Sequence, residues 1–121
     1  MDNKLQVIHD VFFSDQDIND ILYSALSISD SWFTDITIEG NQIGEYITDQ
    51  VSLGGRLFIR DKSSNLRFML NKEKFANGLR HFIKANRMEC VDDGVLDIYK
   101  IHGKDADSIV QYAIFGEILY S

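Results

Sequence analysis

"VSLGGRLFIRDKSSNLRFML", residues 51–70, contains the pattern that decides the predicted fold. Leu57 and Ile59 share one face of a strand, and the polar stretch DKSSN that follows is typical of a turn. Leu66, Phe68 and Leu70 alternate with other residues on the way back. The segment therefore predicts a β-hairpin with one face toward a core, and the other predicted elements are arranged around it.

Gly54 and Gly55 raise the question of whether the start of this segment binds phosphate. A phosphate loop of the GxxxxGK[ST] type leads into a helix, because free N–H groups at the helix start hold the anion. Here the glycines lead into a strand, and the Lys-Ser/Thr pair is missing. We therefore interpret them as a bend or bulge where the hairpin begins.

Upstream of the hairpin, the pattern predicts a strand, a helix and two further strands. Residues 4–13 are rich in β-branched and aromatic side chains, as strands are. Ser14 is a suitable N-cap for the helix. Residues 32–40 and 45–53 are predicted as strands, although Asp49 falls on the apolar side of the second. The apolar stripe of the helix recurs at helical spacing and comprises Ile18, Ile21, Leu22, Ala25 and Leu26.

Downstream of the hairpin, the pattern predicts two helices and a short final strand at 117–121. Asn71 is a good N-cap for a helix over residues 72–87, in which Gly78 costs about 1 kcal/mol relative to alanine unless something packs closely there. Asp105 is predicted to cap a second helix that ends at Gly116. Together these elements predict a single α+β domain over residues 1–121, with an antiparallel sheet of about five strands covered by about three α-helices.

The composition indicates more about the cellular compartment of the protein than about its activity. Cys90 is the only cysteine, so no internal disulfide can form and a reducing compartment is expected. The first residues have neither the basic stretch nor the apolar run of a secretory signal, and no apolar run is long enough to span a membrane. The sequence therefore predicts a cytoplasmic protein.

The net charge of −7 is unevenly distributed along the chain. Residues 1–55 hold ten acidic residues and one basic residue, residues 56–87 hold nine basic and two acidic, and residues 88–121 hold seven acidic and two basic. Two interpretations follow. Either the basic segment packs beside the acidic ones and their charges compensate, or the fold displays separate acidic and basic faces, one of which binds a partner.

The leading hypothesis is a non-enzymatic interaction protein whose acidic face imitates phosphate charge and meets an Arg/Lys-rich surface of a nucleic-acid-binding complex. The candidate residues of this face are Asp15, Asp17, Asp20, Asp30, Asp35 and Glu39. The alternative is a nucleic-acid-binding accessory protein that uses residues 56–87, with Phe58 and Phe68 as stacking rings. Its candidate residues are Arg56, Arg60, Arg67, Arg80, Lys84 and Arg87. A homodimer, formed through a sheet edge or through aromatic residues near the C-terminus, is a further hypothesis.

An enzyme is the third class of protein considered. The three histidines and Cys90 have no zinc-binding spacing, and the acidic residues between 92 and 107 do not match the calcium-loop pattern. We therefore predict no catalytic residues, no metal and no cofactor, although distant residues can converge in a fold.

From the Ser-Leu-Gly-Gly stretch to the C-terminal DADSIVQYAIFGEILYS, the chain resembles a group of small uncharacterised proteins of Firmicutes phages and mobile elements. Residues 71–73, Asn-Lys-Glu, depart from the Leu-Thr-Leu helix start of that group. The resemblance implies a setting in phage or mobile DNA and implies no activity; small acidic proteins of that setting are often inhibitors of host defence, such as anti-CRISPR proteins. The matching positions are Ser52, Leu53, Gly54, Gly55, Leu70, Gly78, Asp105, Ala106, Asp107, Gln111, Tyr112, Ala113, Phe115, Gly116 and Glu117.

Overall fold

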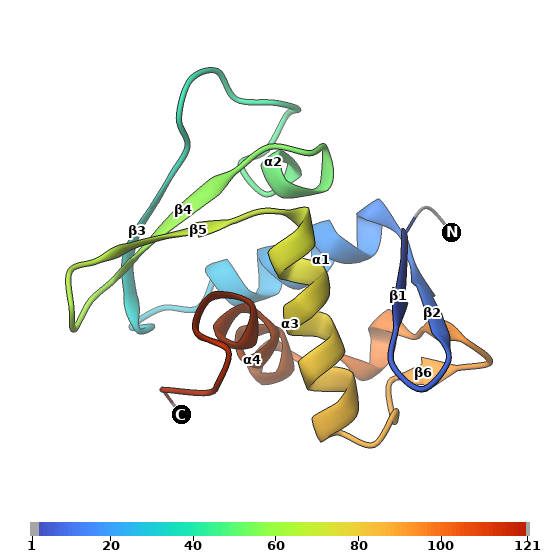
Figure 1. Ribbon diagram of the computed structural model, residues 1–121. Coiled ribbons are helices and arrows are strands. Elements are labelled where there is room, and N and C mark those ends of the chain that lie inside the picture. The colour runs from blue at the N-terminus through green and yellow to red at the C-terminus, as the bar shows by residue number, and fades with distance from the viewer. Residues whose placement is uncertain (1–2, 121) are drawn as a thin grey trace.

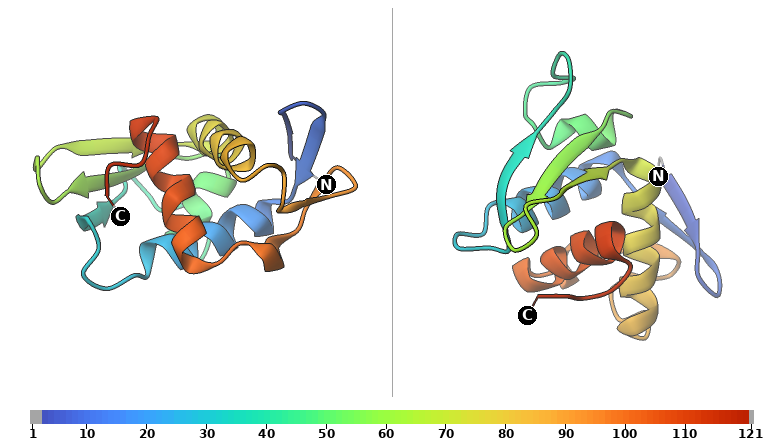
Figure 2. Two further views of the ribbon diagram at one scale, coloured as in Figure 1. Left: turned by 90° about the horizontal axis from the view of Figure 1, so that it is seen from below. Right: turned by 60° about the vertical axis from the view of Figure 1, so that its left-hand side comes forward.

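Three helices lie between two small β-sheets in the computed structural model, which describes residues 3–120 (Figures 1 and 2). One sheet has the order β3-β4-β5 and the other has the order β1-β2-β7-β6. The helices are α1 (Asp15–Leu26), α3 (Lys72–Ala85) and α4 (Gly103–Phe115), with a single turn α2 (Asp49–Ser52) and a 3₁₀ turn η1 (Ile98–Lys100). The strands are β1 (Asn3–Gln6), β2 (Asp10–Phe13), β3 (Phe33–Thr37), β4 (Leu57–Asp61), β5 (Arg67–Leu70), β6 (Val91–Asp92) and β7 (Val95–Leu96).

The α+β class is confirmed, but the strands form two sheets instead of one. The predicted first strand over residues 4–13 is a tight hairpin, because the chain turns at residues 7–9 and Gln6 pairs with Asp10. Strand β2 then pairs with β7 in parallel, through Phe12 and Val95. This pairing places the β1–β2 hairpin in a different sheet from β4.

The hairpin at the centre of the sequence is confirmed. Strands β4 and β5 are antiparallel, with Leu57 opposite Leu70 and Ile59 opposite Phe68. Asp61 ends β4 and fixes the turn, since its carboxylate accepts hydrogen bonds from Ser63 N at 3.3 Å and Ser64 Oγ at 2.7 Å. The bend before the hairpin also follows the prediction. Gly54 has φ +94°, and a side chain on Gly55 would collide with the Gln50 amide, whose Nε2 would lie 2.7 Å from its Cβ.

The predicted strand over residues 45–53 is wrong, because these residues form a turn and α2. Ile47 and Val51 are four residues apart, a spacing that fits one helical face as well as one face of a strand. In the fold Val51 is fully buried while Leu53, which the alternation placed on the same face, is 53% exposed. The unexpected position of Asp49 in the strand pattern has its explanation here, since Asp49 is the first residue of α2.

The helix starts depend on the local capping signals. Ser14 caps α1 in a capping box with Asp17, and Asn71 caps α3, both as predicted. The N-cap of α4 is His102, three residues before the predicted cap Asp105, and Asp105 accepts a hydrogen bond from the His102 N–H. Helix α3 ends at Ala85, two residues earlier than predicted.

Helices α3 and α4 approach each other closely at Gly78. A Cβ atom placed on Gly78 would lie 2.5 Å from Ile109 O and 2.7 Å from Ala113 Cβ. The close packing that would justify a glycine inside a helix is therefore present. The buried side chains of α3 form one apolar stripe at helical spacing, which comprises Phe75, Leu79, Phe82 and Ile83.

The predicted C-terminal strand is wrong for residues 117–120, which form an irregular strap, while Ser121 lies outside the described residues. Gln111, fully buried in α4, holds the strap. Its Oε1 accepts hydrogen bonds from Leu119 N and Tyr120 N at 3.0 and 2.9 Å, and its Nε2 donates to Asp107 Oδ2 and Tyr120 O at 2.8 and 2.9 Å. The Tyr120 hydroxyl donates to Asp61, and its ring stacks on Trp32. The strap thus ties α4 to the β4–β5 turn.

Candidate functional site

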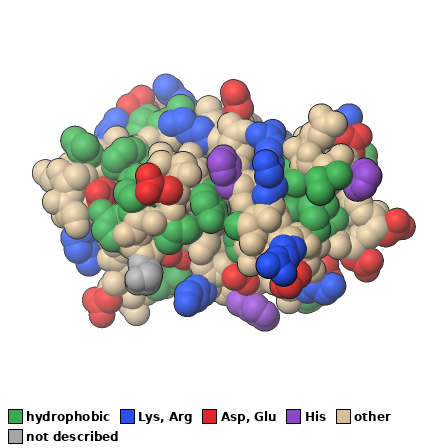
Figure 3. Space-filling model, turned by 60° about the horizontal axis from the view of Figure 1, so that its bottom comes forward, with side chains coloured by type: hydrophobic (Ala, Val, Ile, Leu, Met, Phe, Trp, Pro, Cys, Tyr) green, Lys and Arg blue, Asp and Glu red, His purple; other side chains and the backbone are tan. Residues whose placement is uncertain are grey.

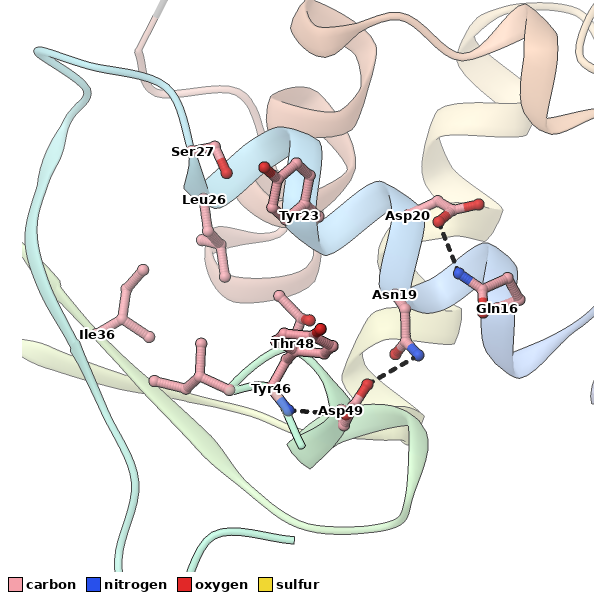
Figure 4. A pocket seen from close by; sticks show the side chains of 11 residues that line it. Gln16, Asn19, Asp20, Tyr23, Leu26, Ser27, Ile36, Tyr46, Thr48 and Asp49 are labelled. Carbon is pink, nitrogen blue, oxygen red and sulfur yellow. Dashed lines mark hydrogen bonds between the residues drawn. The ribbon is translucent and has the colours of Figure 1, made fainter. Parts of the chain in front are cut away.

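A groove with a volume of about 510 Å³ lies between α1 and the chain that leads into α2 (Figure 4). This volume is within the range of small-ligand sites in proteins. We call it the α1 groove. It is lined by Gln16, Asn19, Asp20, Tyr23, Leu26, Ser27, Ile36, Tyr46, Ile47, Thr48 and Asp49.

Helical periodicity builds the first wall of the groove. The buried stripe of α1 faces the core, with Ile18, Ile21, Leu22 and Ala25 each at most 1% exposed. Three- and four-residue steps from Gln16 therefore place a second stripe along the helix, which includes Asn19, Asp20, Tyr23 and Leu26. The polar residues stand toward the start of α1 and Leu26 at its end, so the groove has a polar end and an apolar end.

Asp49 builds the second wall by closing a tight turn. Its Oδ2 accepts hydrogen bonds from Glu45 N at 3.0 Å and Tyr46 N at 2.9 Å, and its Oδ1 accepts one from Asn19 Nδ2 at 3.1 Å. Gly44 makes this turn possible, since its φ is +80° and a side chain there would meet Asp49 Cβ at 2.7 Å. The turn directs the Tyr46 ring outward, where it is 63% exposed.

The chemistry of the groove combines aromatic, apolar and acidic groups. Tyr23, 68% exposed, and Tyr46 supply two rings, and the groove includes the carboxylates of Asp20 and Asp49 but no Lys, Arg or His. The Asp20 side chain makes one local contact, as acceptor from Gln16 Nε2 at 2.8 Å. The Oδ1 atom of Asn19 is buried and has no hydrogen-bond donor among the described residues. An acceptor in this state costs about 1–3 kcal/mol, which a donor would recover.

Four of the six residues of the predicted acidic face are engaged in contacts within the fold. Asp17 is buried and accepts a hydrogen bond from Ser14 N, so it serves the start of α1. Asp15, Asp35 and Glu39 are in ion pairs with basic residues of segment 56–87. Asp20 and Asp30 are exposed and have no ion-pair partner in residues 3–120, but only Asp20 lines the α1 groove.

Three of the six residues of the predicted basic surface, all in or next to the β4–β5 hairpin, are paired with acidic residues. Arg56 and Arg67 both pair with Glu39, at 3.5 and 2.8 Å, and Arg60 pairs with Asp35 at 3.4 Å. The Arg67 guanidinium also covers the ring of Phe58, 4.2 Å from its centroid, and Phe58 is only 8% exposed. Neither ring offered for base stacking is free, since Phe68 packs edge-on against Phe115.

The rest of the basic set lies on and after α3 and does not form a single line along the helix. Arg80 donates a hydrogen bond to Gln6 O at 3.0 Å and is tied to β1, whereas Lys84 is exposed. Arg87 lies beyond the end of α3 with φ +55°, so it does not continue the helical spacing. On the face shown in Figure 3, acidic, basic and hydrophobic side chains are intermixed. Charge compensation between segments thus describes much of this surface.

Three carboxyl and thiol groups have shifted pKa values, and each has a structural cause. Hydrogen bonding by Asn3 is the main cause that lowers the pKa of Asp15, with Lys72 adding to it against the effect of burial. Burial alone would raise the pKa of Asp61, but hydrogen bonds from Ser64 and Tyr120 outweigh it and the pKa is lowered. Burial raises the pKa of the Cys90 thiol, which opposes its use as a nucleophile.

Two further hollows flank α4, and residues that line them have structural roles. One, of about 340 Å³, includes Cys90 and His102, but Cys90 is 3% exposed and His102 caps α4. The other, of about 420 Å³, lies beside Trp32 and Tyr120, where the strap is held. Among residues 3–120 no three His, Cys, Asp or Glu side chains gather in a way that could hold a metal ion.

Comparisons of the chain with protein-family models, with curated proteins and with solved structures find no match in any of the three. No helix among the described residues has the length and apolar character needed to cross a membrane. The sequence analysis identified Asp20 as a site residue but not Tyr23, Tyr46, Asn19 or Asp49. The one available signal was Asp49, whose carboxylate fell on the apolar side of the strand predicted there.

Proposed function

We propose that the protein is a non-enzymatic interaction protein that docks on a basic surface of another protein through the α1 groove. The observation that carries this proposal is the composition of the groove: two exposed tyrosines and two carboxylates, with no basic residue in the lining. Tyrosines are favoured at protein interfaces, because each ring offers a large contact area at a low cost in conformational entropy. The acidic edge favours a positively charged partner and speeds its association.

The resemblance to phage and mobile-element proteins supports the biological setting of the proposal. In that setting the partner is a nucleic-acid-binding complex of host defence, such as a CRISPR effector, and the protein is its cytoplasmic inhibitor. A surface that binds phosphate is rich in arginine and lysine, so an acidic groove is a suitable competitor. The ion pairs of Arg56, Arg60 and Arg67 favour this protein partner over the nucleic-acid alternative.

The structure guides the choice of variants for the test. Charge reversal at Asp17 would remove the capping box of α1 and confuse lost binding with lost stability. Asp20 is exposed and outside the core, so Asp20→Arg tests the groove. Asp92→Arg introduces the same change at an exposed position of β6, outside the groove, and is the matched control.

The experiment immobilises each form of the protein and measures retention of host proteins at increasing salt, beside a gel-shift titration with DNA and RNA. We expect a retained nucleic-acid-binding protein that wild type and Asp92→Arg hold equally and that Asp20→Arg releases. Equal retention by all three forms would refute docking through the α1 groove. Tight DNA or RNA binding at physiological salt, lost in Lys84→Glu, would favour the nucleic-acid alternative.

A further inference from the structure

We infer that the α1 groove receives the guanidinium group of an arginine side chain from a protein partner. The inference rests on the proposed function and adds the chemical identity of the group that the groove binds. It follows from three properties of the lining residues: charge, aromatic surface and an unpaired hydrogen-bond acceptor.

The charge of the groove favours a cation. Asp20 and Asp49 are the ionisable acids of the lining, and no Lys, Arg or His lines it. Asp49 is already engaged by two backbone N–H groups and by Asn19, whereas Asp20 has only the neutral amide of Gln16 as a partner. Asp20 is therefore the carboxylate that remains available to a positively charged group from outside.

The aromatic surface favours arginine over lysine. A guanidinium is planar and stacks on aromatic faces, and it is less strongly hydrated than an ammonium group. Tyr23 on α1 and Tyr46 on the opposite wall provide rings on two sides of the groove (Figure 4). The apolar end at Leu26, Ile36 and Ile47 suits the methylene stem of a long side chain.

The unpaired acceptor favours a ligand with several N–H donors. Asn19 donates through Nδ2 to Asp49, and this bond fixes the orientation in which Oδ1 is left without a donor. Guanidinium carries five N–H donors in a fixed fork, so it suits a groove that offers both a carboxylate and an unpaired amide oxygen. Asn19 Oδ1 has almost no accessible surface in the free protein, so a donor reaches it only if the groove changes when the ligand binds.

The test uses N-acetyl-arginine amide as the probe and the full chain labelled with ¹⁵N. We expect saturable shifts at Gln16, Asp20 and Tyr46 and in the side-chain amide of Asn19. The citrulline analogue, which keeps the shape and loses the charge, should bind at least tenfold more weakly, and the lysine analogue should also bind more weakly. Equal binding of arginine and citrulline, or shifts that map outside the groove, would overturn the inference.

Variants locate the effect and separate the inference from the proposed function. Tyr23→Ala, Tyr46→Ala and Asp20→Asn should each weaken arginine binding by about two- to fivefold. Tyr99→Ala, at a tyrosine that is 90% exposed in η1 and outside the groove, should leave it unchanged. Absence of arginine binding, together with partner retention that Asp20→Arg abolishes, would refute arginine recognition alone. Arginine binding without any effect of Asp20→Arg on partner retention would refute the proposed function alone.

Discussion

Replacing Gly78 with alanine gives the sharpest test of the helix packing, because local and tertiary effects have opposite signs. Alanine is favoured over glycine inside a helix by about 1 kcal/mol, so propensity predicts a more stable protein. The structure predicts the reverse. The new Cβ would lie 2.5 Å from Ile109 O and 2.7 Å from Ala113 N, both backbone atoms of α4.

Side-chain rotation cannot relieve contacts with backbone atoms, so α3 and α4 must move apart. Overpacking of this kind costs about 3 kcal/mol, the upper part of its usual range. After the gain in propensity, Gly78→Ala should lower the free energy of unfolding by about 2 kcal/mol and the melting temperature by about 8 °C. Urea titrations followed by circular dichroism measure both the midpoint and its slope.

Gly103→Ala is the matched control for this experiment. Gly103 is the first residue of α4, and a Cβ placed there meets no atom within 4 Å, so its stability should change by less than about 0.5 kcal/mol. Ala113→Gly removes one of the atoms that the new methyl group meets. The double variant Gly78→Ala/Ala113→Gly should therefore lose less stability than the sum of the losses of the two single variants. A Gly78→Ala protein as stable as wild type would refute the close approach of α3 and α4.

Three further predictions concern the strap, its pH dependence and the bend before β4. Gln111→Leu should lower the free energy of unfolding by about 2–4 kcal/mol, because four hydrogen bonds are lost, one of them to a carboxylate. Amide exchange at Leu119 and Tyr120 should become faster, and unchanged exchange would contradict the role of Gln111 in holding the strap. Wild type should lose stability as pH falls below about 4, because the folded pKa of Asp61 lies below its usual value of 3.8 and protonation removes the contribution of its hydrogen bonds. Tyr120→Phe should reduce that acid-dependent loss when urea titrations at pH 7 and pH 3 are compared, and an undiminished loss would assign it to other groups. Gly54→Ala should cost about 1–2 kcal/mol through its positive φ, although no atom crowds the position, and a neutral result by thermal unfolding would contradict that backbone conformation.

The parts of the fold that were predictable are those set by neighbouring residues. The capping signals of Ser14 and Asn71 lie within four residues of the bonds they make, and the apolar stripes of α1 and α3 follow a single period. The β4–β5 hairpin is also local, since five residues connect its strands. Each of these elements was therefore correctly placed within a few residues.

The parts that were not predictable depend on residues distant in the sequence. The division into two sheets follows from the pairing of Phe12 with Val95. Four of the six candidate acidic residues are engaged within the fold, and Asp35 shows why: β3 lies beside β4, which brings Asp35 next to Arg60. The α1 groove needed both α1 and the misassigned residues 45–53, so the sequence could place Asp20 but not the aromatic and amide groups around it.

The parallel pairing of β2 and β7 also has a consequence for how the chain is synthesised. Because Phe12 meets Val95, the first hairpin has no partner strand until most of the polypeptide has left the ribosome. During that interval Phe12 lacks its partner Val95, and Ile8, in the turn of the hairpin, is 75% exposed even in the finished protein. Nascent-chain arrest at successive lengths would show this hairpin gaining protease resistance only after residue 96 has emerged.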